Sequence, residues 1–249
     1  MISLETFVKN KDILVVAHRG SSGAIPENSL SAYRQAIEDG SDMIEMDVQI
    51  TLDNQIVAYH DFVPYGFEED LSNLNYEVIS NIDIGNGYDS KYKGEKIPLL
   101  EDAIKLIENK NYLMLEIKTI AGNNFTKNAE FLLDLIHKYN YLDKTLVGSF
   151  NHSALSILKK IQPNLRTAAI KIPGDVRLPS EIKTSIGCDA FICDIDELNH
   201  SVEEDSLNSG LFIGVYSIDT KSQFEEALKY NVTALATNYP SKVRQWLEE

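Results

Sequence analysis

Titratable side chains gather in four short stretches of this sequence, each at or near the end of an apolar run. The stretches are His18-Arg19, Glu45-x-Asp47, His60-Asp61 and Glu116-x-Lys118. Alternate residues of a strand face the same side, so the two acids of the second stretch point together, as do the acid and the lysine of the fourth. Perturbed titratable groups cluster at functional sites, and we therefore treat the four stretches as candidate parts of one site.

Glu45, Asp47 and Glu116 would repel one another if they converged, and each would raise the pKa of the others unless a cation neutralised them. A set of carboxylate oxygens suits a hard divalent ion better than it suits zinc. The predicted cofactor is therefore one divalent metal ion, Mg²⁺ or Ca²⁺, and the sequence does not choose between them.

His18 and His60 are candidates for general acid and base, because the ordinary histidine pKa lies close to working pH. Arg19 and Lys118 are fixed positive charges suited to phosphate oxygens. A metal, two histidines and two cations together describe phosphodiester cleavage better than other common reactions. Taken singly, each group has a structural explanation, such as a hydrogen-bonded histidine or a plain ion pair. Their joint placement at successive strand ends favours a site.

Eight strand-like runs alternate with amphipathic helical stretches along the chain. The strands are expected at 13–18, 43–51, 112–119, 145–150, 166–171, 190–195, 211–218 and 232–237. Helices are expected within 27–40, with Asn28 or Ser29 as the cap, and near 99–109, 127–140, 152–161, 179–186, 200–208, 220–230 and 241–249. Strands that are apolar on both faces and alternate with helices indicate a parallel sheet.

Eight such units in 249 residues predict an α/β fold of the (β/α)8 TIM-barrel type, as a single domain over residues 1–249. An open doubly wound sheet is the rival, but it normally uses fewer strands, and no G-x-G-x-x-G opens the first helix. Barrel enzymes build their sites at the carboxyl ends of the strands, which is where the four polar stretches fall.

The unit after the second strand is irregular. "QITLDNQIVAYHD" predicts a hairpin with Asp53-Asn54 as a two-residue turn, which would set Asp47 opposite His60. Residues 62–96 then form a long excursion rich in Tyr, Asn and Gly, which we expect to be a small inserted subdomain.

Composition excludes several classes of protein. The chain is 43% hydrophobic and 24% charged, as in ordinary globular proteins, and its net charge of −15 argues against nucleic acid or an anionic membrane as a partner. No run is long enough for a membrane helix, and the first 20 residues lack the order of a secretion signal, so we expect a cytoplasmic protein without stable membrane association. Cys188 and Cys193 are expected to be structural thiols.

The same residues carry a family resemblance. "AHRG", "PEN", "IEMDVQITLDNQIVAYHD", "IPLLEDAI" and "LEIK", followed by "SF" at 149–150, "VYSID" and "TNYP", resemble the glycerophosphodiester phosphodiesterases in order and spacing over essentially the whole chain. The resemblance implies a TIM barrel with a small insertion after strand 2. It also implies metal-dependent hydrolysis of small glycerophosphodiesters to sn-glycerol 3-phosphate and an alcohol such as choline or ethanolamine.

The resemblance also implies roles for particular residues. Glu45, Asp47 and Glu116 correspond to the ligands of one divalent metal, His18 and His60 to the acid-base pair, and Arg19 and Lys118 to phosphate-binding residues. In the family the glycerol 2-hydroxyl is thought to attack phosphorus, and water then opens the cyclic phosphate with the histidine roles exchanged. Which histidine acts first stays open.

Two positions depart from the family pattern. Tyr216 stands where the family usually has tryptophan, and is expected to be a wall for the glycerol. Asn238 replaces the acid of the late "TD-x-P" and is interpreted as a local loop difference. Two other functions stay open: phospholipase D-like activity on lysophospholipids, and a catalytically silent barrel that binds phosphodiesters. Head-group preference and oligomeric state, including a homodimer, are also open.

Overall fold

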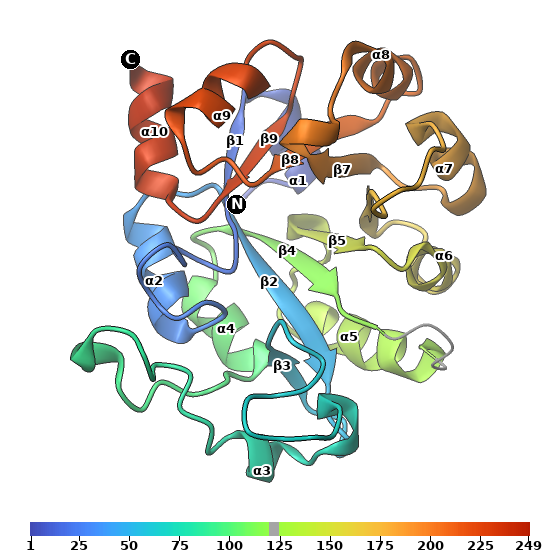
Figure 1. The fold of residues 1–249 in the computed structure, drawn as a ribbon. Coiled ribbons are helices and arrows are strands. Elements are labelled where there is room, and N and C mark those ends of the chain that lie inside the picture. Colours follow the sequence, from blue (N-terminus) through green and yellow to red (C-terminus); the bar gives the residue numbers. More distant parts are fainter. Residues whose placement is uncertain (120–124) are drawn as a thin grey trace.

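Eight parallel strands close into a barrel in the computed structural model, which describes residues 1–119 and 125–249 (Figure 1). The barrel strands are β1 (Leu14–Ala17), β2 (Met43–Ile50), β4 (Tyr112–Ile117), β5 (Thr145–Ser149), β6 (Arg166–Ile170), β7 (Ala190–Asp194), β8 (Phe212–Tyr216) and β9 (Ala234–Thr237). β1 pairs with both β9 and β2, which closes the sheet on itself. The predicted (β/α)8 architecture is confirmed.

A helix follows each barrel strand, after the hairpin and insertion in the case of β2. These helices are α2 (Leu30–Glu38), α4 (Leu100–Ile107), α5 (Thr126–Lys138), α6 (His152–Ile161), α7 (Pro179–Ile186), α8 (His200–Asn208), α9 (Lys221–Ala227) and α10 (Pro240–Glu248). Every expected strand and helix is present, with ends that differ by a few residues. Ser29, rather than Asn28, caps α2, because its side chain accepts a hydrogen bond from the Ala32 backbone.

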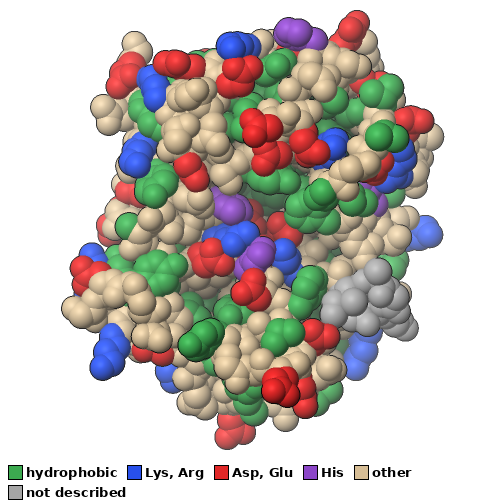
Figure 2. Space-filling view, viewed as in Figure 1, with side chains coloured by type: hydrophobic (Ala, Val, Ile, Leu, Met, Phe, Trp, Pro, Cys, Tyr) green, Lys and Arg blue, Asp and Glu red, His purple; other side chains and the backbone are tan. Residues whose placement is uncertain are grey.

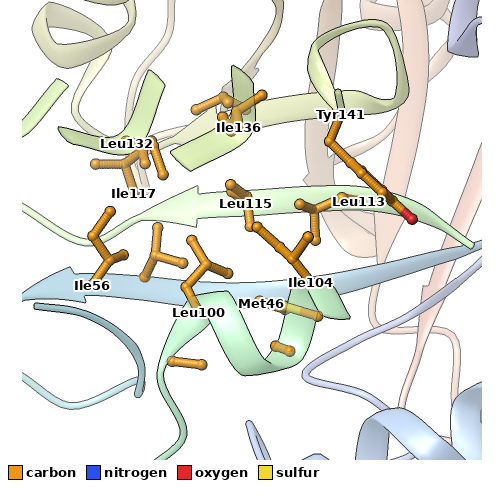
Figure 3. Packing of buried hydrophobic residues seen from close by; sticks show 14 of the residues in the cluster. Met46, Ile56, Leu100, Ile104, Leu113, Leu115, Ile117, Leu132, Ile136 and Tyr141 are labelled. Carbon is orange, nitrogen blue, oxygen red and sulfur yellow. The ribbon is translucent and has the colours of Figure 1, made fainter. Parts of the chain in front are cut away.

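The core between strands and helices follows the alternation along each strand. Leu113 and Leu115 on β4 point outward, where they meet Ile104 of α4 and Leu132 and Ile136 of α5 (Figure 3). All five side chains are buried. The other face of each strand looks into the barrel and, at the carboxyl end, into the mouth.

The barrel interior combines bulky side chains with several small ones. TIM barrels normally fill this space with layers of bulky branched residues. Here several strands instead contribute glycine or alanine: Gly148, Ala168, Ala190, Gly214, Ala234 and Ala236. A cavity of about 520 Å³ therefore extends from the mouth down the inside of the barrel.

A short helix that was not expected from the sequence, α1 (Leu4–Lys9), lies at the far end of the barrel. Leu4 is buried, and the ring of Phe7 stacks on Tyr112 at the start of β4 with 4.6 Å between ring centroids. Leu4 and Val8 line the end of the cavity opposite the mouth. The helix thus supplies the floor of the barrel.

The hairpin after β2 forms as expected, with one correction. β3 (Ile56–Ala58) pairs antiparallel with β2, with Ile50 opposite Ile56. The turn therefore holds three residues, 52–54, with Asn54 in the left-handed region at φ 62°, as three-residue hairpin loops require. The extra residue shifts the register, so Asp47 pairs with Tyr59 through a backbone hydrogen bond, and the prediction that it lies opposite His60 is wrong.

The excursion between β3 and α4 has a small core of its own. It contains the single-turn helices η1 (Leu71–Asn73), α3 (Tyr76–Ile79) and η2 (Ser90–Tyr92), and is drawn in teal to green at the bottom of Figure 1. Leu71, Ile79 and Ile97 are fully buried against Val57 of β3. The excursion is tied to the hairpin and to α2 by hydrogen bonds, including that from Ser31 to Glu95.

Two further expectations concern the rest of the chain. Cys188 and Cys193 are free thiols, and both are buried. Among the residues described, no helix is both long and apolar enough to cross a bilayer.

Candidate active site at the barrel mouth

The four polar stretches of the sequence meet at the carboxyl ends of β1, β2 and β4. Figure 2 shows histidine, basic and acidic side chains together in a hollow at the centre of the face that carries the mouth. His18, Arg19, Glu45, His60, Glu116 and Lys118 all line the large cavity.

Three carboxylates form a tight cluster within this mouth. One oxygen from each of Glu45, Asp47 and Glu116 lies within 4.8 Å of the others. Glu45 and Asp47 extend from β2, and Glu116 is paired with Asp47 across the β2–β4 ladder. All three side chains are buried.

Three buried acids this close together disfavour one another's ionised forms. Burial raises the pKa of Glu45 well above its usual value, and Asp47 and Glu116 raise it further. Burial and then Asp47 also raise the pKa of Glu116. Among the residues that the structure describes, Glu45 Oε1 and Asp47 Oδ1 are buried without a hydrogen-bond partner. Orphaned hard oxygens at this spacing fit a divalent cation such as Mg²⁺ or Ca²⁺.

Arg19 and Lys118 stand against the same acids. Arg19 Nε lies 3.0 Å from Asp47 Oδ2, and Lys118 Nζ lies 3.0 Å from Glu116 Oε1 and 3.7 Å from Asp47 Oδ1. Arg19 takes the left-handed conformation at φ 56°, which turns its backbone N–H toward Glu45 Oε2 at 2.8 Å. Arg19 also donates through Nη1 to Glu27, so both cations lie beside acids at the mouth.

Asn28 fixes the orientation of Asp47. Its Nδ2 donates to Asp47 Oδ2 at 2.8 Å, and its Oδ1 accepts from the Asp47 backbone and from the Tyr33 hydroxyl, both at 3.1 Å. Asn28 is 1% exposed and has φ 52°, a conformation that asparagine tolerates better than most residues. The "PEN" stretch thus contributes to the site, a role that the cap interpretation missed.

His18 belongs to a chain of hydrogen bonds that reaches Asp219. Its Nδ1 lies 2.9 Å from Asn238 Oδ1, while Asn238 Nδ2 donates to Asp219 Oδ2 at 2.6 Å. Since the Asp219 carboxylate only accepts, Asn238 must present its oxygen to His18, which places the proton on Nδ1 and leaves Nε2 free. Burial, and then the charge of Arg19, lower the pKa of His18. The interpretation of Asn238 as a local loop difference is therefore incomplete.

Hydrogen bonds fix both the ring of His60 and the backbone on either side of it. Its Nδ1 lies 2.7 Å from Asp61 Oδ1, and the buried Gln49 side chain donates to the carbonyls of Tyr59 and Asp61 at 2.8 Å each. His60 is 34% exposed and lines the cavity at the mouth.

Tyr216 lies at the end of β8 and lines the cavity with its half-buried ring. Burial and then Asp194 raise the pKa of Tyr216 to about 12, so its hydroxyl is a neutral donor.

Lys171 and His152 do not belong to the acid cluster. Lys171 pairs with Glu197, and His152 is buried with Nε2 on the Ile170 carbonyl.

Comparisons with known proteins agree with this geometry. The model of the glycerophosphoryl diester phosphodiesterase family matches residues 18–242. A glycerophosphodiester phosphodiesterase of Caldanaerobacter subterraneus is 31% identical over 91% of this chain and 94% of its own. An Oleispira antarctica phosphodiesterase, solved with the product sn-glycerol-3-phosphate, superposes with a TM-score of 0.87 at 23% identity, covering 95% of this chain and 97% of its own. With the motifs, the barrel and the mouth in agreement over residues 18–242, this chain belongs to the glycerophosphoryl diester phosphodiesterase family.

Proposed function

We infer that this protein hydrolyses glycerophosphodiesters to sn-glycerol 3-phosphate and an alcohol. The observation that carries the inference is that the family match spans residues 18–242 and that both histidines and all three acids are present in one mouth. The substrate would be a small molecule, because the reacting groups lie in a hollow rather than on a flat surface.

Glu45, Asp47 and Glu116 would hold one divalent metal, and the unpartnered oxygens of the first two support this assignment. When bound, such an ion polarises phosphoryl oxygens and lowers the pKa of a hydroxyl beside it. Arg19 and Lys118 would neutralise the remaining phosphate charge through their N–H groups.

The two histidines have different surroundings, and we assign them different roles on that basis. His18 has its Nε2 free and a lowered pKa, so it would take the proton of the glycerol 2-hydroxyl as that oxygen attacks phosphorus. His60 is partly exposed at the mouth and would donate a proton to the departing alkoxide as its bond to phosphorus breaks. Water would then open the cyclic phosphate with the two roles exchanged, which restores both histidines.

Purified protein is expected to release glycerol 3-phosphate from glycerophosphocholine only while a divalent ion is present. EDTA should abolish the release, and Mg²⁺ or Ca²⁺ should restore it, because without the metal ion the three buried acids repel the phosphate. An enzymatic assay of glycerol 3-phosphate measures this directly. No release with either metal from several glycerophosphodiesters would favour a silent binding barrel instead.

A second candidate substrate is a lysophospholipid. The observation that favours it is the apolar interior, where half-buried Phe212, Ala234 and Ala236 line the cavity below the mouth. A human lysophospholipase D is 23% identical over 93% of this chain and 85% of its own. Choline release from lysophosphatidylcholine, followed in a separate choline assay, tests this second substrate, since a polar diester has no acyl chain to place there.

Replacing Asn238 by aspartate is expected to move the acidic limb of the pH–rate profile to higher pH by about one unit. The new carboxyl would share one proton with Asp219, which now accepts from Asn238, and would bring negative charge up to His18 Nδ1. That charge stabilises the imidazolium form of His18, and so opposes the burial and Arg19 charge that now lower its pKa. As a base must be neutral, the variant should lose activity at a pH where the parent is still active. The limb is measured as kcat/KM against pH.

Asn140→Asp provides the matched control for this shift. Asn140 lies in the exposed loop before β5, at the opposite end of the barrel, and its φ of 53° suits aspartate as well as asparagine. This variant should keep the parental profile. An unmoved limb in Asn238→Asp would show that Asn238 does not govern the protonation of His18.

A further inference from the structure

A second cavity, of about 460 Å³, lies between the barrel mouth and the insertion. His60 lines both this cavity and the large one. A substrate whose phosphate sits among Arg19, Lys118 and the acid cluster can therefore extend past His60 into the second cavity. This is the side from which His60 would protonate the departing alcohol, so the cavity is placed to hold that alcohol.

Tyrosine rings form much of its wall. Tyr59 comes from the end of the hairpin, and Tyr65 and Tyr88 come from the insertion. Tyr65 is 79% exposed and Tyr88 is 43% exposed, so neither ring is buried in a hydrophobic core. The face of a tyrosine ring attracts a cation within about 6 Å, and several such rings around one space recognise quaternary ammonium groups.

The carboxylates that line this cavity are not matched by lysine or arginine side chains in its described lining. Glu27, Asp61 and Asp83 line it, and no lysine or arginine is among the described residues that do so. Glu27 is paired with Arg19 and Asp61 with His60, whereas the Asp83 carboxylate accepts only the backbone N–H of Gly85 among its described contacts. The Asp83 carboxylate therefore has no cationic partner among the described contacts and can accept a ligand's ammonium group.

We propose that this cavity binds the ammonium group of the alcohol, so that the protein selects glycerophosphodiesters with a cationic head group such as choline or ethanolamine. The proposal rests on the proposed function and names its substrate more narrowly. The charges along the site then match a zwitterion: Arg19 and Lys118 face the phosphate, and Asp83 and the tyrosine rings face the ammonium. A neutral head group such as glycerol or inositol could hydrogen-bond to the acids, but would gain nothing from the ring faces.

The test compares kcat/KM for glycerophosphocholine with kcat/KM for the neutral glycerophosphoglycerol. The ratio should favour the cationic substrate in the parent protein, and should fall by roughly 5- to 10-fold in Asp83→Asn and in Tyr65→Leu. Tyr65→Leu keeps the test informative if Asp83→Asn disturbs its loop, because so exposed a side chain is not needed for folding. Glycerophosphoethanolamine separates the two contributions, since its primary ammonium relies more on Asp83 and less on the rings.

Glu69→Gln serves as the control, because Glu69 is an exposed acid of the same insertion that does not line the cavity. It should keep the parental ratio. Binding of free choline, followed by calorimetry, gives a readout that needs no turnover, and it should weaken in both cavity variants. Turnover of both substrates at an unchanged ratio would overturn the proposal while leaving the proposed function intact. Failure of every phosphodiester, together with choline binding lost in the variants, would refute the function and keep the ammonium site.

Discussion

Replacing His60 by alanine is expected to lower kcat for glycerophosphocholine by roughly 10²- to 10⁴-fold, yet to spare a diester whose alcohol is a nitrophenol. The nitrophenolate is a stable anion, so it departs without a proton and does not need the acid. His18→Ala should lose activity toward both substrates, because the glycerol hydroxyl still needs a base when the leaving group is good. Steady-state rates for the two variants with the two substrates measure this difference.

The histidine variants should fold normally, since His60 is 34% exposed and the ring of His18 lines a cavity. His137→Ala is the control, because His137 is an exposed histidine of α5 and should keep full activity. If the rate of His60→Ala fell as much with the nitrophenyl substrate as with the choline substrate, His60 would not be the acid. A near-parental rate of His60→Ala with glycerophosphocholine would remove it from catalysis altogether.

The substitution Glu45→Gln is expected to abolish metal-dependent activity without destabilising the metal-free protein. In EDTA the variant should melt at or above the parental temperature. Burial and two neighbouring acids raise the pKa of Glu45, which means that its ionised form is disfavoured there, and an amide removes that repulsion. The amide oxygen can still accept the backbone hydrogen bond from Arg19.

Adding Mg²⁺ or Ca²⁺ should then distinguish the parent protein from the Glu45→Gln variant. A ligand that binds only the folded state raises stability by RT ln(1 + [L]/Kd), so the parental melting temperature should rise with metal and that of Glu45→Gln should not. Melting followed by circular dichroism measures both effects, and Glu69→Gln should behave like the parent. A large loss of stability in EDTA would mean that Glu45 is a structural ion-pair partner rather than a metal ligand.

Local patterns of the sequence were sufficient to predict the barrel fold and the residues at its mouth. Strand and helix periodicity depend on which faces are buried, and eight such units have few ways to close. The rule that sites form at the carboxyl ends of strands then selected His18, Glu45 and Glu116, and the structure brings these into one mouth. The hairpin register was wrong by one residue, because Asn54 lengthens the turn through a backbone angle that a two-residue turn does not predict.

Contacts between residues far apart in the chain were not predictable in this way. Asn238 meets His18 across 220 positions, because β9 and β1 are neighbours only once the barrel has closed. Asn28 and Gln49 are ordinary polar residues in the sequence, and their hold on Asp47 and on the backbone around His60 depends on the tertiary structure. Helix α1 was missed because six residues give too short a periodic pattern.

The sequence by itself determined the fold class, the acids, the histidines and the cations, because these follow from residue type and from positions along single strands. Only the tertiary structure decided how those groups are oriented and charged, and it alone revealed the hollow interior and the tyrosine-lined cavity beside His60. The physical reason is that burial, hydrogen-bond partners and cavity walls are properties of neighbours in space. In a closed barrel most of those neighbours come from distant parts of the chain.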